Sequence, residues 1–178
     1  MEKPKVATVW LTGCAGCHMS LLDLDERIID IATAAEITAS PITDIKDIPQ
    51  VDVGIVEGAV SNEHNLEVLE KLRARCKILI ALGDCAGFGC VPMLRNAFPL
   101  REVLAHGFIW TRSTSGGMVP DDPELPKLME QVHPLRDFVK VDIHLPGCPP
   151  SPDVIYHALT ELVAGRMPRI PRELLKYD

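Results

Sequence analysis

Residues 77–85 read Lys-Ile-Leu-Ile-Ala-Leu-Gly-Asp-Cys, and this stretch decides the fold of the chain. The run is short, almost wholly apolar and bounded by a glycine, which is typical of a strand buried on both faces of a parallel sheet. We therefore expect a buried strand over residues 77–82. This strand would deliver Cys85 to the loop at its carboxyl end.

The strand signal recurs four times along the chain, and a helical spacing of apolar residues recurs three times. The further strands are expected over residues 6–11, 36–39, 53–56 and 141–145. The helices are expected over residues 18–34, 62–75 and 151–164. Ser61 is the expected N-cap of the second helix, and Gly165 fits the C-terminal cap of the third.

Strands that alternate with helices favour a mainly parallel sheet, because parallel neighbours need crossover connections. The prediction is an α/β fold: a flavodoxin-like, doubly wound, three-layer sandwich. A length of 178 residues fits a single domain over residues 1–178. Residues 98–134 interrupt the rhythm with Ser-Thr-Ser-Gly-Gly at 113–117 and several prolines, and we interpret them as a functional or docking loop.

The composition excludes several classes of partner. A net charge of −7 and an aromatic content of 4% argue against nucleic acid and against an anionic membrane surface. The longest apolar runs are far shorter than the roughly 20 residues that span a bilayer, so no membrane anchor is expected. Residues 1–6 carry no apolar signal-peptide core, which predicts a cytoplasmic protein.

Cysteines mark the expected strand ends. Cys-Ala-Gly-Cys at 14–17 follows the first strand, Cys85 follows the strand over 77–82, and Cys148 follows the last strand within Pro-Gly-Cys-Pro-Pro. The carboxyl ends of parallel strands share one edge, where open α/β folds bind their ligands. Thiols without an export signal favour metal or redox chemistry over disulfides. The sequence therefore predicts a thiolate site made by Cys14, Cys17, Cys85 and Cys148.

The favoured occupant of this thiolate site is one iron–sulfur cluster, and several alternatives to it remain open at this point. Structural zinc also takes four cysteines, and a lone Cys-x-x-Cys is typical of a redox dithiol. Cys90, five residues after Cys85, is close enough to ligate in its place. Residues 113–117 resemble a flavin phosphate loop, although they do not follow the first strand. Cys76 precedes its strand, so we expect it at the opposite edge as a small buried residue.

Other side chains border the expected site. Glu57 ends the strand over 53–56 and is expected to be either a loop carboxylate or a proton or hydrogen-bond partner. His18 and His144 flank the cysteine loops, and both are expected to be polar neighbours rather than ligands. Trp10 and Trp110 are expected in the core or at an interface.

Four segments taken in order, residues 11–17, 56–60, 83–86 and 146–150, resemble those of [NiFe]-hydrogenase small subunits. The resemblance covers almost the whole chain. More narrowly, the chain is similar to the short, cytosolic small subunit of soluble NAD-reducing hydrogenases. A related subunit of NADH:quinone oxidoreductase has adjacent cysteines at the first site, where this chain has Cys-x-x-Cys. Many relatives have glycine where this chain has Cys90.

This resemblance implies a role for each cysteine of the set. It implies that Cys14, Cys17, Cys85 and Cys148 hold one proximal [4Fe–4S] cluster, and that the nickel–iron centre lies in a partner large subunit. It also implies that electrons pass on to diaphorase iron–sulfur and flavin subunits that reduce NAD. The chain would then be a hydrogenase subunit that is not catalytic by itself. A flavin on this chain, such as FMN, is the less favoured addition.

Overall fold

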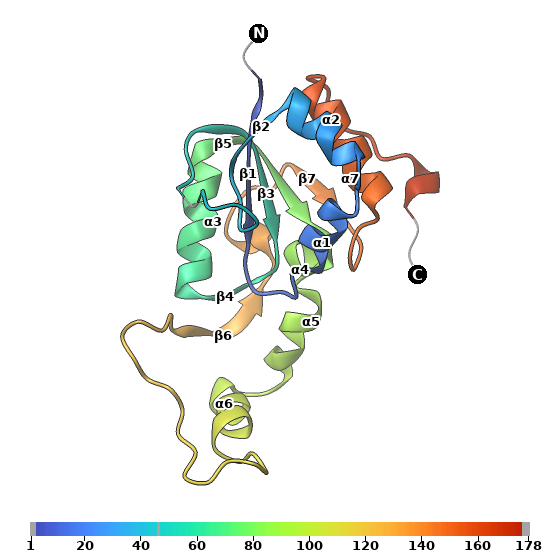
Figure 1. The fold of residues 1–178 in the computed structure, drawn as a ribbon. Helices are drawn as coiled ribbons and strands as arrows, with labels where there is room; N and C mark the ends of the chain where they lie inside the picture. Colours follow the sequence, from blue (N-terminus) through green and yellow to red (C-terminus); the bar gives the residue numbers. More distant parts are fainter. Residues whose placement is uncertain (1–2, 46, 176–178) are drawn as a thin grey trace.

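The computed structural model describes residues 3–45 and 47–175, and its centre is a five-stranded, wholly parallel sheet (Figure 1). The strand order is β2-β1-β3-β5-β7. These strands are β1 (Lys5–Trp10), β2 (Glu36–Ala39), β3 (Val51–Glu57), β5 (Cys76–Leu82) and β7 (Ile143–Leu145). Counted along this sheet alone, the order is 2-1-3-4-5, the flavodoxin-like arrangement. The predicted fold class is confirmed.

Helices cover both faces of the sheet, as Figure 1 shows. On one face lie α1 (Gly16–Leu22), α2 (Arg27–Ala34) and α7 (Pro152–Val163), and on the other lies α3 (Glu63–Arg75). Successive strand residues point to opposite faces, so Ile80 packs in the core beneath α2 and α7 while Leu79 packs in the core beneath α3. This alternation builds the three layers.

Two predicted details of the helices are wrong. The helix expected over 18–34 is divided into α1 and α2, with Asp25 in the left-handed region at a φ of 52° between them. Carboxylates are unfavourable at a helix C-terminus, and aspartate tolerates this conformation better than most residues. The N-cap of α3 is Asn62, whose side chain accepts a hydrogen bond from the Asn65 backbone, and not Ser61.

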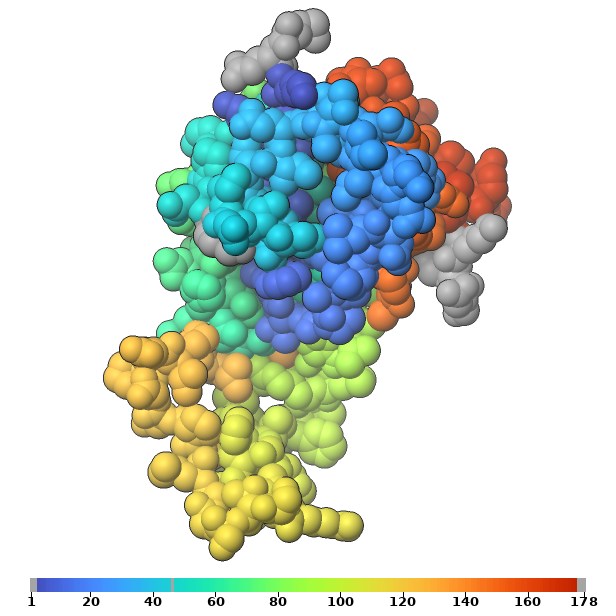
Figure 2. All heavy atoms as spheres, in the orientation of Figure 1, coloured from blue at the N-terminus to red at the C-terminus, as the bar shows by residue number. Residues whose placement is uncertain are grey.

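The region from 98 to 134 contains more regular structure than its sequence suggests. Met93 ends α5 (Cys90–Met93), and then come η1 (Leu94–Ala97), α6 (Leu100–Phe108) and β6 (Leu128–His133). Strand β6 pairs antiparallel with β4 (Val60–Asn62). Figures 1 and 2 show that α6 and the following loop project beyond the carboxyl edge of the main sheet. The prediction of a loop is therefore wrong for 100–108 and 128–133.

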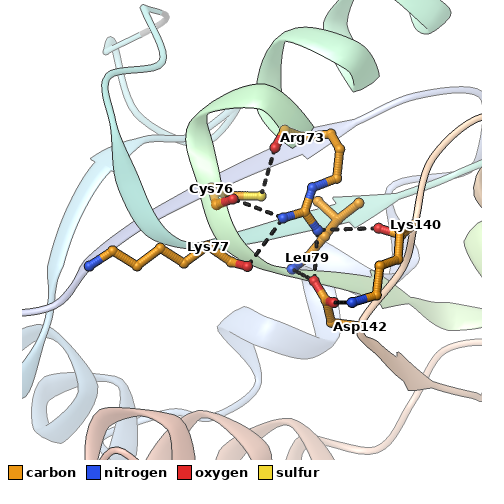
Figure 3. Close-up of polar contacts among 6 residues, drawn as sticks. All are labelled: Arg73, Cys76, Lys77, Leu79, Lys140 and Asp142. Carbon is orange, nitrogen blue, oxygen red and sulfur yellow. Dashed lines mark hydrogen bonds and ion pairs between the residues drawn. The ribbon is translucent and has the colours of Figure 1, made fainter.

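The amino edge of the sheet is tied by a polar network around Arg73 (Figure 3). Its guanidinium donates to Asp142 at 2.7 Å and to the backbone carbonyls of Cys76 and Lys77. Cys76 begins β5 here, 8% exposed, and lies at the edge opposite to the other cysteine loops, as predicted. The remaining short elements are α4 (Gly83–Phe88), η2 (Leu135–Asp137) and η3 (Arg172–Leu174).

Among the helices that the structure describes, none is long and apolar enough to cross a bilayer. Met1 and Glu2, which belong to the N-terminal stretch considered in the sequence, lie outside the described residues.

Candidate metal centre

The four predicted cysteines converge from three loops at the carboxyl edge of the sheet. Cys14 and Cys17 come from the β1–α1 segment, Cys85 lies in α4, and Cys148 follows β7. The pKa of the Cys17 thiol is raised, first by burial, then by Glu57 and by the other three cysteines. Such mutual influence requires the thiols to lie near one another. The convergence predicted from strand ends is present in the structure.

Hydrogen bonds fix these loops relative to one another. Asp84 donates its backbone N–H to the carbonyl of Gly147 at 3.0 Å, and its carboxylate accepts from the Gly147 N–H at 2.8 Å. The Ser20 hydroxyl donates to the carbonyl of Pro150 at 2.6 Å. The turn that carries Cys85 and the helix that carries Cys17 are thus both attached to the loop of Cys148.

Gly83 leaves room for the sulfur of Cys17. Its φ is 83°, in the left-handed region, and a Cβ added there would overlap Cys17 Sγ. At this position a side chain would therefore be strained by the backbone and would also displace a sulfur of the site. This glycine was not singled out in the sequence, although its place between a buried strand and a cysteine marks it.

The four thiols differ in exposure. Cys17 is 7% exposed and Cys85 is half-buried, whereas Cys14 and Cys148 are exposed. Burial, followed by the nearby Cys90, Cys148 and Cys14, raises the pKa of Cys85 to about 11. The thiolate is the form that binds metal. Positive iron would offset both the burial and the repulsion among these sulfurs.

Cys90 lies at the border of this site. It begins α5 at a φ of 40°, and it is one of the groups near Cys148 that raise the pKa of that thiol. It also raises the pKa of Cys85. The structure therefore keeps Cys90 within reach of the site, as its spacing from Cys85 predicted.

The donor set of the site, four free cysteine thiols, is the set that a four-iron cluster takes. Sulfurs around one tetrahedral zinc lie about 3.8 Å apart, given Zn–S distances near 2.3 Å. Among the residues described, no three His, Cys, Asp or Glu side chains are gathered closely enough to hold one metal ion. A four-iron cluster gives each cysteine its own iron, so its ligands are more widely spaced. The four thiols fit such a group.

Beneath the site lies a buried pair that the sequence indicated only in part. Glu57, 2% exposed, accepts hydrogen bonds from the backbone N–H groups of Cys17 at 3.3 Å and His18 at 2.9 Å. Its carboxylate also lies 2.5 Å from Nδ1 of His18, which is fully buried and whose Nε2 is 3.1 Å from the Thr8 hydroxyl. Glu57 is thus a buried anchor for the first cysteine segment rather than a loop carboxylate.

The aromatic and hydroxyl-rich candidates have other surroundings. Trp10 is 44% exposed and packs edge-on against His18 at 5.4 Å between ring centroids. Trp110 is 61% exposed. Residues 113–117 lie in the projecting segment beyond α6, away from the first strand that a flavodoxin phosphate loop follows (Figure 1). Nothing in their position favours a flavin.

Comparison with known proteins identifies the family. The family model described as "NADH ubiquinone oxidoreductase, 20 Kd subunit" matches residues 14–162, most of the chain and all four cysteines of the site. The chain belongs to this 20 kDa subunit family. Within the family, it is 42% identical to the delta subunit of the NAD-reducing hydrogenase HoxS of Cupriavidus necator, over 99% of this chain and 86% of that protein.

Other relatives in this 20 kDa subunit family are also hydrogenase subunits. One subunit of the F420-non-reducing hydrogenase vhu of Methanocaldococcus jannaschii is 39% identical over 96% of this chain, which spans 60% of its length. The crystal structure of an NAD⁺-reducing [NiFe]-hydrogenase in the H2-reduced state contains a chain that matches with a TM-score of 0.96 and 43% identity, covering 99% of this chain and all of that one. The resemblance predicted from the four motifs is confirmed.

Proposed function

We propose that this chain is the electron-transfer small subunit of an NAD-reducing [NiFe]-hydrogenase, and that residues 1–178 form one domain holding a single proximal [4Fe–4S] cluster. The ligands are Cys14, Cys17, Cys85 and Cys148. When bound, the cluster supplies one-electron transfer between a hydrogen-oxidising large subunit, which holds the nickel–iron centre, and diaphorase subunits that reduce NAD. The chain is not catalytic by itself.

One observation carries this proposal: four thiols, contributed by three loops, gather at the carboxyl edge of the sheet, as the mutual effects on their pKa values and the contact of Gly83 with Cys17 indicate. The relatives support the assigned reaction, because the similar proteins from Cupriavidus necator and from the solved hydrogenase are described as NAD-reducing. The Cys-x-x-Cys spacing at 14–17 supports the hydrogenase branch of the family over the quinone-reducing branch.

The chain's own residues hold the site rigid and bring it to the surface. Glu57 fixes the backbone of Cys17 and His18 from below, while Asp84 locks the turn of Cys85 to the loop of Cys148. A ligand shell that rearranges little suits electron transfer. The exposed thiols of Cys14 and Cys148 lie on the side that a large subunit would cover.

Anaerobic co-purification with its partner subunits tests the proposal. The purified complex is analysed for metals on this chain and, after reduction, by electron paramagnetic resonance. We expect about four irons per chain, a signal of a reduced cluster and no flavin on this chain. One equivalent of zinc with no iron would overturn the cluster assignment. Hydrogen-dependent reduction of NAD by the same complex tests the assigned reaction.

A further inference from the structure

A second feature of the surface lies outside the cysteine site. A groove of about 1270 Å³ runs between the start of α3, the helix α6 and residues 119–128. Five leucine and phenylalanine side chains line it: Leu100, Leu104, Phe108, Leu125 and Leu128. Its lining thus comes mainly from the projecting segment, which the site described above does not use.

The groove leaves apolar side chains in water. Phe108, Leu125 and Leu128 are 42%, 50% and 42% exposed, and Ala105 is the buried residue of α6. Exposed apolar area is unfavourable relative to burial, and contiguous patches of it usually mark interaction surfaces. The apolar side chains on this side of α6 are therefore suited to burial against another protein segment.

The rim of the groove is acidic. Its carboxylates are Glu63, Glu67, Asp121, Asp122 and Glu124, and the lysine beside them is Lys127. Within the described residues, the ion pair of this rim is the one between Glu67 and His64, at 3.9 Å. A rim of like charge around an apolar floor favours a cationic occupant, because complementary charge steers and orients association.

The groove also lies beyond the edge of the sheet that carries the cysteines. Figures 1 and 2 show α6 and the following loop extending beyond the carboxyl edge of the sheet, the edge at which Cys14, Cys85 and Cys148 lie. A subunit that covers this edge is therefore within reach of the projecting segment. This position favours a partner of the same complex over an unrelated protein.

We propose that this groove binds a segment of a partner subunit that carries a row of apolar side chains flanked by lysines. The apolar row covers Phe108 and Leu125, and the basic residues pair with the carboxylates of the rim. The proposal rests on the proposed function only in placing the chain in a multi-subunit complex. It makes no use of the cluster, so the two fail independently.

Charge reversal on the rim tests the proposal in the complete complex. The triple variant Glu67→Lys, Asp121→Lys and Glu124→Lys removes three rim carboxylates whose side chains support no described turn. A control variant, Glu36→Lys, Glu70→Lys and Glu173→Lys, makes the same charge change at exposed positions elsewhere. We expect the rim variant to weaken association with the partner subunits by about tenfold or more, and the control to leave it unchanged.

Carbodiimide cross-linking of the unmodified complex provides a second readout. This reagent joins carboxylates to lysines in direct contact, so mass spectrometry should find Glu67, Asp121 or Glu124 linked to lysines of another subunit. Assembly of the rim variant with unchanged affinity would overturn the proposal, as would rim carboxylates linked only within this chain. Iron content is measured on the assembled fraction of both variants and should equal that of the unmodified complex, which separates loss of docking from a direct loss of the cluster.

Discussion

Cys17 is positioned by a glycine, which has no side chain, and by a buried glutamate. Gly83 provides the space against which the sulfur lies, and Glu57 holds the Cys17 backbone N–H from inside the core. Both contacts join residues that are distant in sequence. The geometry of the site is therefore sensitive to single atoms added or removed beside it.

Substituting Gly83 should abolish cluster binding through one added carbon. In Gly83→Ala the new Cβ overlaps Cys17 Sγ, so we expect the purified complex to lose most of its cluster iron. Gly165→Ala is the matched control, because Gly165 has a similar φ of 73° but no atom within 4 Å of the added carbon. The control should cost about 1–2 kcal/mol of backbone strain and keep its iron. Equal iron in both variants would contradict this explanation.

Replacing Cys85 and replacing its neighbour Cys90 should have different effects on cluster binding. We expect Cys85→Ser to lose the cluster and Cys90→Ser to retain it, as measured by iron content and by electron paramagnetic resonance of the reduced complex. Cys85 contributes to the raised pKa of buried Cys17 and Cys90 does not, although Cys90 lies near exposed Cys148. The reverse pattern would assign the third ligand to Cys90.

Among the elements, α3 is joined to the sheet by an ion pair as well as by its apolar packing. Arg73, in the last turn of α3, reaches Asp142 just before β7, and Asp142 also accepts from the Leu79 N–H of β5 at 2.9 Å (Figure 3). Burial by itself would raise the pKa of Asp142, but the hydrogen bonds from Leu79, Arg73 and Lys140 outweigh it and lower the pKa below its ordinary value of 3.8.

This shift predicts a pH dependence of stability. The pKa of Asp142 is lower in the folded chain than in the unfolded chain. Its contribution to the free energy of unfolding is therefore fully present above about pH 4 and is lost as the pH falls through the folded pKa. Asp142→Asn should destabilise the chain by about 2 kcal/mol at neutral pH. Its stability should approach that of the unmodified protein as the solution becomes strongly acidic.

Limited proteolysis of the chain in its complex, repeated over a temperature series at several pH values, measures this difference. Lys77→Gln serves as the control, because it breaks the exposed pair with Asp52 at the same edge and should leave the stability unchanged. A difference between Asp142→Asn and the unmodified protein that stayed constant down to the lowest pH would argue against this account.

Local sequence pattern was sufficient to predict some of the helices and strands and insufficient for others. Strands β1, β2, β3 and β5 were predicted within two residues of their bounds, and β1, β3 and β5 are compact, mostly buried apolar runs. Strand β6 reads Leu-Met-Glu-Gln-Val-His and was missed, since it pairs with β4 in a small separate sheet and only Val132 of its six residues is buried. The break at Asp25 was missed because α1 and α2 share one helical period.

At the scale of the whole molecule, large apolar side chains are exposed on and around the projecting segment. Leu94, Phe98, Trp110 and Met118 are each at least 61% exposed, in addition to the groove residues. Together with the exposed thiols of Cys14 and Cys148, this surface needs a partner.

We therefore expect the chain produced without its partners to aggregate or to lose its cluster. Size-exclusion chromatography with iron analysis under anaerobic conditions measures both. Production together with the large subunit should restore a soluble complex with full iron. Recovery of the isolated chain as a stable monomer containing all of its iron would refute the expectation of an obligate interface.

The sequence by itself determined the parallel α/β fold and the four cysteines that meet at one sheet edge. Both follow from local pattern, because a buried strand must be apolar and a parallel strand must end at the shared edge. Only the tertiary structure decided what surrounds those cysteines. The burial of the Glu57–His18 pair, the contact between Gly83 and Cys17, and the groove beside α6 each join residues from separate segments, and their distances are set by packing rather than by local sequence.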